Sequence, residues 1–556
     1  MLSRWRVNIF LISILLAWGL VFYRLFYLSY FQHDVFIKTA ETQYQNQKSS
    51  LVKRGNIYAS DLSNGENELV ATQKTYAFIY VIPKEATDPA LSAQKLFETV
   101  GVSIDQALKL FEKKDDPFEI VERNPSEVQL DAVRSLNLKE IAIGYEERRI
   151  YPKGNFLSQV LGFLGFDGDE RTGQYGVESF YNDQLSGKDS TSPSFFGKKN
   201  NLTASRGDDI VLTVDKNIQL FAEEELSYLM KKWNSVSGTI IIQDPRDGSI
   251  LAMAGSPSFD PNNYGQYQLE DFTNKSVQEM FEPGSSFKPI TLSGALDQKK
   301  ITPETTYYDY GEVEIAGYKI KNFNEKSFGT QTMSQVLEKS LNTGAMFAEE
   351  KLGDKNFLNY MINFGFGQAS GIDLAVESAG DISNLYSGRK INFATASFGQ
   401  GIAVTPLQLI NAYSALANGG RLYKPFIVRE RTKPNGESIK TQPELVGTPI
   451  SEKTSSQIKA MLVKVVENGF DKATVKGYDV AGKTGTAQIA SKTGGYSEEF
   501  VHDIVGFAPA FDPKFVVLIK LEKPKGIKFA SDSLSPSLGK ITKFLLNYFQ
   551  IPPTKQ

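Results

Sequence analysis

A serine and a lysine three residues apart, Ser285 and Lys288, are the first residues in this chain whose types and spacing suggest chemistry. They lie in Glu282-Pro-Gly-Ser-Ser-Phe-Lys-Pro289, where Pro283-Gly284 interrupts the chain and the apolar run 287–296 predicts a helix. Helical residues three positions apart share one face, with Cβ atoms roughly 5–6 Å from each other. Unpaired N–H groups at a helix start also favour a developing oxyanion. The spacing therefore predicts a serine nucleophile beside a lysine base.

This spacing is not specific by itself. It recurs at Ser50/Lys53, Ser92/Lys95 and Ser456/Lys459. A helix start followed by a solvated lysine is an equally good interpretation of any single copy, so other features of the chain must distinguish them.

Composition narrows the possible chemistry. The chain has 556 residues, which predicts two or more domains, and 41% hydrophobic residues, which indicates a globular protein. A net charge of −3 gives no reason to expect nucleic acid as a partner. The absence of cysteine excludes disulfides and thiol nucleophiles, and the two histidines, His33 and His502, are too few for a multi-histidine metal site. Because His33 lies near the N-terminus, a Ser-His-Asp triad is nearly excluded, and a lysine or a carboxylate must carry any acid–base chemistry.

The N-terminus predicts a membrane anchor. Arg4 and Arg6 precede an almost continuous apolar run over 7–23, and Arg24 is followed by further apolar residues to Leu28. Such a run is long enough to span a bilayer, and the preceding arginines place the N-terminus in the cytoplasm. Bulky residues follow the run, where a cleavable signal peptide needs small ones. We expect a cytoplasmic tail at 1–6, an uncleaved anchor at 7–28 and an extracytoplasmic remainder.

Residues 29–205 predict an elongated pedestal of mixed strands and helices without obvious catalytic residues. The clearest elements are a strand at 75–81 and helices near 91–99, 104–113 and 126–135. The polar stretch 186–207 reads as a linker or surface loop, so we expect the second domain to occupy 206–556.

The second domain predicts an α+β fold. Asp215 can cap a helix, and the turn-forming residues 244–248 separate two strands, at 238–243 and 249–253. A mostly helical stretch that contains Ser285 follows. The domain ends with strands at 480–489, 501–508 and 514–521 and an amphipathic helix at 538–549. This order predicts an antiparallel sheet with helices on both faces.

Two further motifs lie in this domain. Ser340-Leu-Asn342 is placed where helical periodicity gives way to turn-forming residues, although Ser-x-Asn is common and recurs at Ser135-Leu-Asn137. Lys483-Thr-Gly485 lies in a strand of small residues, which lets another backbone approach closely, as an extended peptide would. A second Lys-Thr-Gly at 492–494 is polar and turn-like, and we interpret it as a hairpin loop without a chemical role.

Ser-x-x-Lys, Ser-x-Asn and Lys-Thr-Gly, in this order within one domain, form a specific combination that β-lactamases and penicillin-binding proteins share. The chain resembles the class B, monofunctional penicillin-binding proteins, most closely the division-type transpeptidases. The resemblance spans nearly the whole chain and is carried also by Arg54-Gly-Asn-Ile57, Arg149-Ile-Tyr-Pro152, Gly173-Gln-Tyr-Gly-Val-Glu178, Ser397-Phe-Gly-Gln-Gly401, Thr405-Pro-Leu-Gln408 and Val505-Gly-Phe-Ala-Pro509. It implies a five-stranded antiparallel sheet flanked by helices, like that of serine β-lactamases.

The chain departs from the family pattern at two places. The segment 59–65 reads Ala-Ser-Asp-Leu-Ser-Asn-Gly, without the usual Asp-Arg-Asn-Gly run. We also expect no repeat module after the catalytic domain.

The resemblance implies a role for each motif residue in cross-linking peptidoglycan stem peptides. Ser285 would attack the carbonyl between two D-alanines, and Lys288 would accept its proton, which requires a lysine pKa lowered by roughly three units from ~10.4. The nearby cation Lys483 would lower it in that way. Ser340 would relay a proton to the leaving group, and Asn342 would bind Lys288 and the substrate amide. Lys483 and Thr484 would bind the terminal carboxylate of the substrate, and Gly485 would contact the substrate from the same strand. The backbone N–H groups of Ser285 and Thr486 would bind the oxyanion.

The resemblance also implies binding partners and a cellular location. β-Lactams would acylate the nucleophile, no metal or cofactor is required, and a membrane glycan polymerase of the SEDS family and division proteins would be partners at the bacterial plasma membrane. His502 and Asp503 are expected to be a strand-flanking polar pair without a catalytic role. An elongation-type transpeptidase, a β-lactamase, a D,D-carboxypeptidase and a non-enzymatic division scaffold are the alternatives.

Overall fold

The computed structural model describes residues 53–187 and 206–555, except 115, 169, 324 and 491–494, together with residues 16, 18 and 19. Nearly all of the predicted anchor, nearly all of the predicted linker and the second Lys-Thr-Gly lie outside the described residues. Among the helices of the described ranges, none combines the length and apolar character needed to span a membrane. The described residues from Arg54 onward belong to one compact unit.

The N-terminal part of this unit mixes strands and helices, as the sequence predicts. The predicted strand at 75–81 is the end of the 15-residue strand β2 (Asn67–Val81), of which residues 72–81 pair with β4 (Ile141–Ile150). The three predicted helices are α3 (Pro89–Val100), α4 (Ile104–Phe111) and α5 (Glu127–Leu136). They enclose a small separate core with β2, β3 and β4. The other elements are β1 (Ile57–Ser60), β3 (Glu119–Glu122), α6 (Ser158–Leu161), β5 (Phe163–Asp167), β6 (Glu170–Gln174), α7 (Gly176–Phe180) and α8 (Asn182–Ser186).

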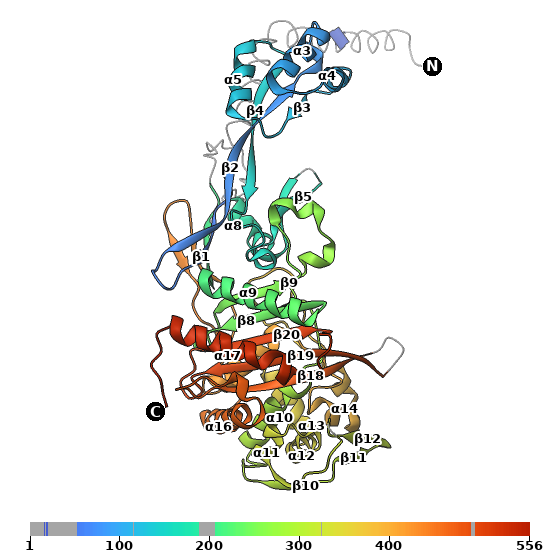
Figure 1. Ribbon diagram of the computed structural model, residues 1–556, viewed down its shortest axis with the longest axis vertical. Coiled ribbons are helices and arrows are strands. Elements are labelled where there is room, and N and C mark those ends of the chain that lie inside the picture. Colours follow the sequence, from blue (N-terminus) through green and yellow to red (C-terminus); the bar gives the residue numbers. More distant parts are fainter. Residues whose placement is uncertain are drawn as a thin grey trace, which may run out of the picture. The chain divides into compact units, whose positions relative to one another are not determined.

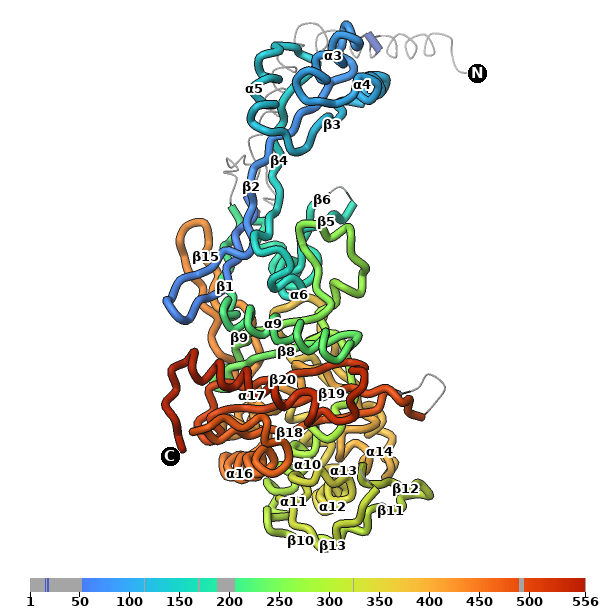
Figure 2. Tube along the Cα trace, viewed as in Figure 1, coloured from blue at the N-terminus to red at the C-terminus, as the bar shows by residue number. Residues whose placement is uncertain are grey.

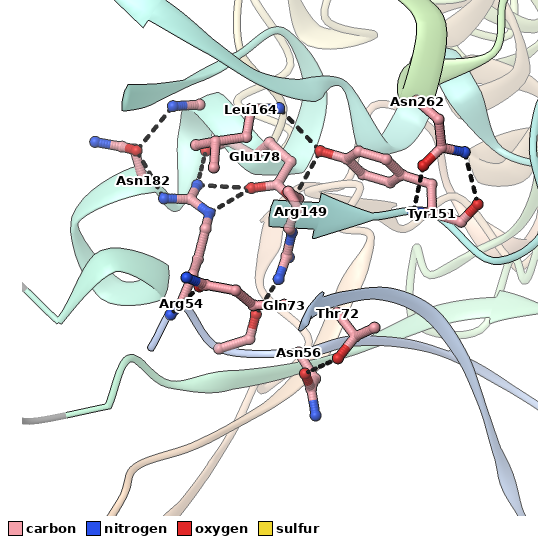
Figure 3. Close-up of polar contacts among 12 residues, drawn as sticks. Arg54, Asn56, Thr72, Gln73, Arg149, Tyr151, Leu164, Glu178, Asn182 and Asn262 are labelled. Carbon is pink, nitrogen blue, oxygen red and sulfur yellow. Dashed lines mark hydrogen bonds and ion pairs between the residues drawn. The ribbon is translucent and has the colours of Figure 1, made fainter. Parts of the chain in front are cut away.

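A buried ion-pair network ties the start of this region to its end (Figure 3). Glu178, which is fully buried, forms ion pairs of 2.6 Å with Arg54 through one carboxylate oxygen and with Arg149 through the other. Arg149 also donates to the carbonyl of Gly55 at 2.7 Å, and Tyr151 donates to Glu178 at 3.2 Å. Three sequence motifs that lie far apart along the chain thus meet in one place.

The strands β1 to β4 belong to a sheet that also contains strands from the C-terminal half of the chain. Its strands follow the order β16-β15-β7-β1-β2-β3, with β4 beside β2. The strands from the C-terminal half are β7 (Asp209–Asp215), β15 (Val428–Thr432) and β16 (Ser438–Lys440). Local sequence patterns do not predict this sheet, which crosses the expected domain boundary at 186–207.

The C-terminal half is built around the predicted five-stranded antiparallel sheet, with the strand order β18-β19-β20-β8-β9. Figure 2 shows the late strands beside the two strands that precede the long helical stretch. The strands are β8 (Ser237–Gln243), β9 (Ile250–Ser256), β18 (Ala481–Ala490), β19 (Tyr496–Ala508) and β20 (Phe515–Glu522). Their central residues are buried on both sides, because helices cover both faces.

Helices α9 (Lys216–Trp233) and α17 (Ala530–Tyr548) pack on one face of this sheet, and α15 (Pro406–Ala417) and α16 (Glu452–Gly469) pack on the other (Figure 1). Asp215 caps α9 as predicted, with its carboxylate accepting from the N–H groups of Asn217 and Ile218. Besides α15, α16, β15 and β16, the α-helices and strands between β9 and β18 are α10 (Lys288–Asp297), β10 (Thr306–Asp309), β11 (Glu312–Ile315), β12 (Tyr318–Lys321), β13 (Gly329–Thr332), α11 (Met333–Glu338), α12 (Asn342–Leu352), α13 (Asp354–Asn363), α14 (Lys390–Ala396), β14 (Leu422–Tyr423) and β17 (Leu445–Gly447).

Candidate active site

Ser285 lies in a tight helical turn, Gly284–Phe287, that continues directly into α10. Pro289 fits in the first turn of α10, where the backbone N–H groups need no partner within the helix. Gly284 has a φ of 55°, which an L side chain rarely adopts, and its N–H donates to the carbonyl of Gly399 at 3.0 Å. The carboxylate of Glu282 accepts from the N–H of Gly401 at 3.0 Å. The loop around residues 399–401 therefore braces the turn that presents the serine.

Lys288 points away from solvent and toward the Ser-x-Asn loop. It is completely buried, and its Nζ donates to the carbonyl oxygen of Ser340 at 2.5 Å and to the Oγ of Ser340 at 3.3 Å. Ser340 has a φ of 57°, so the chain turns sharply at this residue between α11 and α12.

Lys483 approaches the same serine from β18. Its Nζ donates to the Oγ of Ser340 at 3.0 Å and to the carbonyl oxygen of Thr484 at 3.1 Å. The hydroxyl of Ser340 thus lies between two lysine amines that come from different elements. This is the geometry needed to pass a proton between them.

Burial decides the charge of both amines. For Lys288, burial and then the nearby charge of Lys483 hold the pKa well below the usual lysine value of about 10.5. For Lys483, burial lowers the pKa to about 8, and the influence of Asp503 acts in the opposite direction. The pKa shifts therefore favour the neutral form of Lys288, whereas Lys483, with a pKa of about 8, keeps its proton at neutral pH.

Two adjoining hollows meet at Ser285 and form one groove. The first has a volume of about 210 Å³ and is lined by Ser285, Ser340, Lys483, Thr484 and Thr486, together with the aromatic residues Phe323, Phe470 and Phe529. The second has a volume of about 360 Å³ and is lined by Ser285, Asn342, Thr486 and Gln488, among others. The Oγ of Thr486 accepts from the N–H of Ala530, which fixes this part of β18 against α17.

The structure gives Asn342 a different partner from the expected one. Its side-chain amide donates to the carbonyl oxygen of Lys321 at 2.9 Å, and its backbone N–H donates to Asn322 at 2.9 Å. Asn322 is in turn held by the buried Asp309. Asn342 therefore lines the groove and anchors the segment 321–322, and Lys288 contacts Ser340 instead.

The other Ser-x-x-Lys copies do not form serine–lysine sites among the described residues. Ser92 donates to Glu140 at 2.7 Å, while Lys95 pairs with Glu98 on the surface. Lys459 donates to the carbonyl of Ala417 at 3.2 Å, and Ser456 is exposed. The fourth serine of this pattern, Ser50, lies outside the described residues.

His502 and Asp503 lie inside β19 with no exposed surface, so the expectation of a strand-flanking pair is wrong. The Nδ1 of His502 lies 2.8 Å from the Oγ of Ser533 on α17, and burial lowers its pKa to about 4, which keeps the ring neutral. Asp503 lies on the opposite face of the strand. The signal in the sequence was the presence of two polar residues in a strand that is otherwise apolar, since such residues need partners when buried.

The arrangement is suited to acyl transfer by a serine with a lysine base. A nucleophilic hydroxyl, a buried neutral amine, a bridging hydroxyl and a cation surround one groove that is open to an extended ligand. Within the described ranges, no group of three or more histidine and carboxylate side chains is arranged to hold a metal ion.

Comparison with known families gives the same assignment. Residues 238–543 match the penicillin binding protein transpeptidase domain, and residues 49–212 match the penicillin-binding protein dimerisation domain. The chain is 34% identical to stage V sporulation protein D of Bacillus subtilis over 504 residues, which cover 87% of this chain and 77% of that protein. It is 26% identical to peptidoglycan D,D-transpeptidase FtsI of Escherichia coli over 99% of this chain and 92% of that protein.

Solved structures share the fold. Penicillin binding protein 2X of Streptococcus thermophilus gives a TM-score of 0.75 at 24% identity, covering 89% of this chain and 79% of that one. Penicillin binding protein 3 of Mycobacterium tuberculosis, solved in complex with aztreonam, gives a TM-score of 0.70 at 23% identity, covering 91% and 98%. With the motifs gathered around one groove, these similarities lead to one conclusion. The chain belongs to the class B penicillin-binding proteins, and its C-terminal half is their transpeptidase domain.

Proposed function

We propose that this chain is a peptidoglycan D,D-transpeptidase and that Ser285 is its nucleophile. The observation that carries the proposal is the hydroxyl of Ser340, which is hydrogen-bonded to the amines of both Lys288 and Lys483 in the groove that also contains Ser285. Relatives whose names include peptidoglycan D,D-transpeptidase support the choice of substrate.

The first half-reaction forms an acyl-enzyme. The Oγ of Ser285 bonds to the carbonyl carbon between the two D-alanines, and its proton passes to the neutral amine of Lys288. The C–N bond to the terminal D-alanine then breaks, and the proton that Lys288 accepted passes through Ser340 to the leaving nitrogen, which leaves Lys288 neutral again. The N–H groups of Ser285 and Thr486 bind the oxyanion, which is a contribution usually worth about 3–4 kcal/mol per donor.

The second half-reaction joins two stem peptides. An amine of a neighbouring stem peptide attacks the ester carbonyl and forms the new amide bond. The proton of that amine goes to Lys288, and Ser285 recovers its hydrogen as the ester bond breaks.

Binding is assigned to the strand β18. The cation of Lys483 and the hydroxyl of Thr484 bind the terminal carboxylate, which is a charge-assisted contact. Gly485 and its neighbours let the extended peptide lie close to the strand. A β-lactam presents the same carboxylate and a strained amide, and it therefore acylates Ser285 in place of the stem peptide.

The direct test is labelling with a fluorescent penicillin. Ser285→Ala is expected to lose labelling completely while it keeps the circular dichroism spectrum and melting temperature of the native protein. Ser456→Ala, which changes an exposed serine in the same Ser-x-x-Lys spacing, is the matched control and is expected to label normally. Persistent labelling of Ser285→Ala would refute the assignment.

We further propose that the apolar run 7–28 anchors the protein in the bacterial plasma membrane, with the catalytic domain outside the cytoplasm. Partners would be division proteins and a membrane glycan polymerase of the SEDS class, which must supply the glycan strands whose stem peptides are cross-linked. A chain that begins at residue 30 should then leave the membrane fraction. Retention of that shortened chain in the membrane would contradict the anchor.

A further inference from the structure

Asp503 is a buried carboxylate directly beside the catalytic strand. It lies in the middle of β19, opposite Gly485 of β18 on one side and Lys520 of β20 on the other. Its side chain has no exposed surface, and among the described residues neither carboxylate oxygen accepts a hydrogen bond. A buried acid without hydrogen-bond donors costs several kcal/mol in its charged form, so it needs an explanation.

Gly485 brings the carboxylate close to the backbone of the catalytic strand. A Cβ atom at Gly485 would lie 1.9 Å from the Oδ2 of Asp503 and 2.4 Å from the carbonyl oxygen of Pro283. The carboxylate therefore occupies the space between the Lys-Thr-Gly strand and the turn that carries Ser285. The hydroxyl of Ser286 is its polar neighbour there, although that hydroxyl donates to the carbonyl of Pro283 at 2.8 Å.

The charged and titratable groups around Asp503 come from every element packed against it. Lys483 reaches in from β18 and Lys520 from β20, and both favour its charged form. Lys520 is already paired at 3.0 Å with Glu279. Tyr413 of α15 donates its hydroxyl to the carbonyl of Ser286 at 2.6 Å, and Lys288 of α10 lies next to Lys483.

The balance of these charges singles out Lys483. Lys520 has Glu279 as a counter-ion, whereas both hydrogen bonds of Lys483 go to neutral oxygen atoms, those of Ser340 and Thr484. Asp503 pairs with Gly485 across the two strands, and Lys483 lies two residues before Gly485, so the side chains of Asp503 and Lys483 lie on the same face of the sheet. From that position the Asp503 carboxylate raises the pKa of Lys483. We propose that Asp503 is a positioning residue of the transpeptidation reaction, whose carboxylate keeps the proton on Lys483 and thereby keeps Lys288 free to act as the base. The inference rests on the proposed roles of Ser285, Lys288 and Lys483.

The direction of the pH effect follows from these groups. Burial raises the pKa of Asp503 to about 7, and Asp503 raises the pKa of Lys483, which burial holds at about 8. Below pH 7 the carboxyl is neutral, and Lys483 keeps its proton without help. Above pH 7 the carboxylate is charged and delays the loss of that proton. Asp503 therefore matters on the alkaline side of the pH profile.

The test compares the second-order rate of acylation by a fluorescent penicillin from pH 6 to pH 9.5 in the native chain and in Asp503→Asn. Asparagine imitates the neutral acid, so the two rates should agree near pH 6. Above pH 7 the variant should acylate more slowly than the native chain. The alkaline limb of its pH–rate profile should shift down by about one pH unit, so that its rate is roughly 10-fold lower near pH 8.5. Asp503→Ser, which removes the charge with a smaller side chain, should show the same shift.

Glu349→Gln is the matched control, because Glu349 is also a buried carboxyl, its pKa is raised to about 8, and it lies on α12 away from β18. It should leave the profile unchanged. A folded Asp503→Asn or Asp503→Ser with an unshifted alkaline limb, or with an equal loss at every pH, would overturn the inference. If neither variant folds, infrared difference spectra of the native chain provide the test. The inference predicts a buried carboxyl that titrates near pH 7, and spectra without such a titration would overturn it. Failure of the native chain to be labelled at Ser285 would instead refute the proposed function itself.

Discussion

At the scale of single residues, the site depends on two lysines that differ in charge although both are buried. Lys288 has no exposed surface, and within the described part of the chain its only hydrogen-bond partners are oxygen atoms of Ser340, so the uncharged form is favoured. Lys483 is almost as deeply buried but lies near Asp503, which stabilises its charge. The sequence places two lysines in the motifs, and the surroundings given by the fold decide which of them is the base.

Lys288→Arg tests the role of the base at this scale. Arginine can donate hydrogen bonds as lysine does, but it is always positively charged and cannot accept a proton at any accessible pH. The acylation rate is expected to fall by about 10²–10⁴-fold, as is typical when general-base catalysis is lost. Stopped-flow measurement with a fluorescent penicillin checks this value.

Lys459→Arg is the control for this change, since Lys459 is also a buried lysine at the end of a Ser-x-x-Lys spacing but donates to the carbonyl of Ala417. Its acylation rate should stay within a factor of two or three of the native rate, because Lys459 does not line the groove and its hydrogen bond goes to Ala417. A Lys288→Arg variant that acylates at the native rate would show that another group takes the proton.

At the scale of elements, the site is the meeting point of one turn, one loop and one edge strand. The turn at Gly284–Phe287 presents Ser285, the loop between α11 and α12 presents Ser340, and β18 presents Lys483. Close backbone approach between β18 and the turn is possible because position 485 has no side chain. The fit between two elements, and not one residue, therefore sets the geometry of the groove.

Gly485→Ala tests this fit. Its methyl group would meet the carbonyl oxygen of Pro283 and the carboxylate of Asp503, so β18 must move away from the nucleophile. The free energy of unfolding should fall by about 1–3 kcal/mol, as in other overpacked sites, and acylation should slow. Gly447→Ala adds a methyl group in the strand β17, where nothing lies within 4 Å, and should change neither quantity. Equal behaviour of the two variants in urea unfolding and penicillin labelling would contradict the close approach.

At the scale of the whole molecule, the sequence predicts the local elements better than the long-range pairing. Helices α3, α4, α5 and α9 and the five strands of the catalytic sheet follow from apolar periodicity and capping residues. The helix α17 begins at Ala530, earlier than the predicted 538, because its first turns are rich in serine and include Pro536, both of which imitate a loop. The seven-stranded sheet was missed since β15 and β16 are short, and since β15 pairs with β7 and β7 with β1, which lie far away in the sequence.

The same contrast holds for the active site. Motif order predicts Ser285, Lys288, Ser340 and Lys483, and the structure brings all four around one groove. Spacing says nothing about which face of a strand a residue occupies relative to a distant element, so the sequence predicts a strand-flanking polar pair at His502 and Asp503 and not a buried carboxylate inside β19. The partner of Asn342, Lys321, depends on how the 321–322 segment folds back, which no local pattern encodes.

Glu178→Gln tests the network that joins the distant N-terminal motifs. Burial opposes the charge of Glu178, but Arg149 and Arg54 outweigh it and lower its pKa. Removal of the anion leaves two buried guanidinium groups without a counter-ion, so the free energy of unfolding should fall by about 3–5 kcal/mol. The pKa of Glu178 is lower in the folded state than in the unfolded state. The stabilisation from its ion pairs is therefore fully present above the unfolded-state pKa of about 4.3, and it is lost as the pH falls through the folded-state pKa.

Urea unfolding from pH 8 down to about pH 2 measures this loss. Glu98→Gln, which changes an exposed acid paired with Lys95 on α3, is the control and should have little effect. A Glu178→Gln variant as stable as Glu98→Gln would show that the network does not hold the region together.

The central claim, that a neutral lysine activates Ser285 for acyl transfer, is tested most directly by locating the β-lactam adduct. The protein is treated with a penicillin at neutral pH and digested, and mass spectrometry identifies the peptide and the residue that carry the added mass. We predict one adduct, on Ser285, with Ser286, Ser340 and Ser456 unmodified. An adduct on any other residue, or no adduct on a folded protein, would contradict the account.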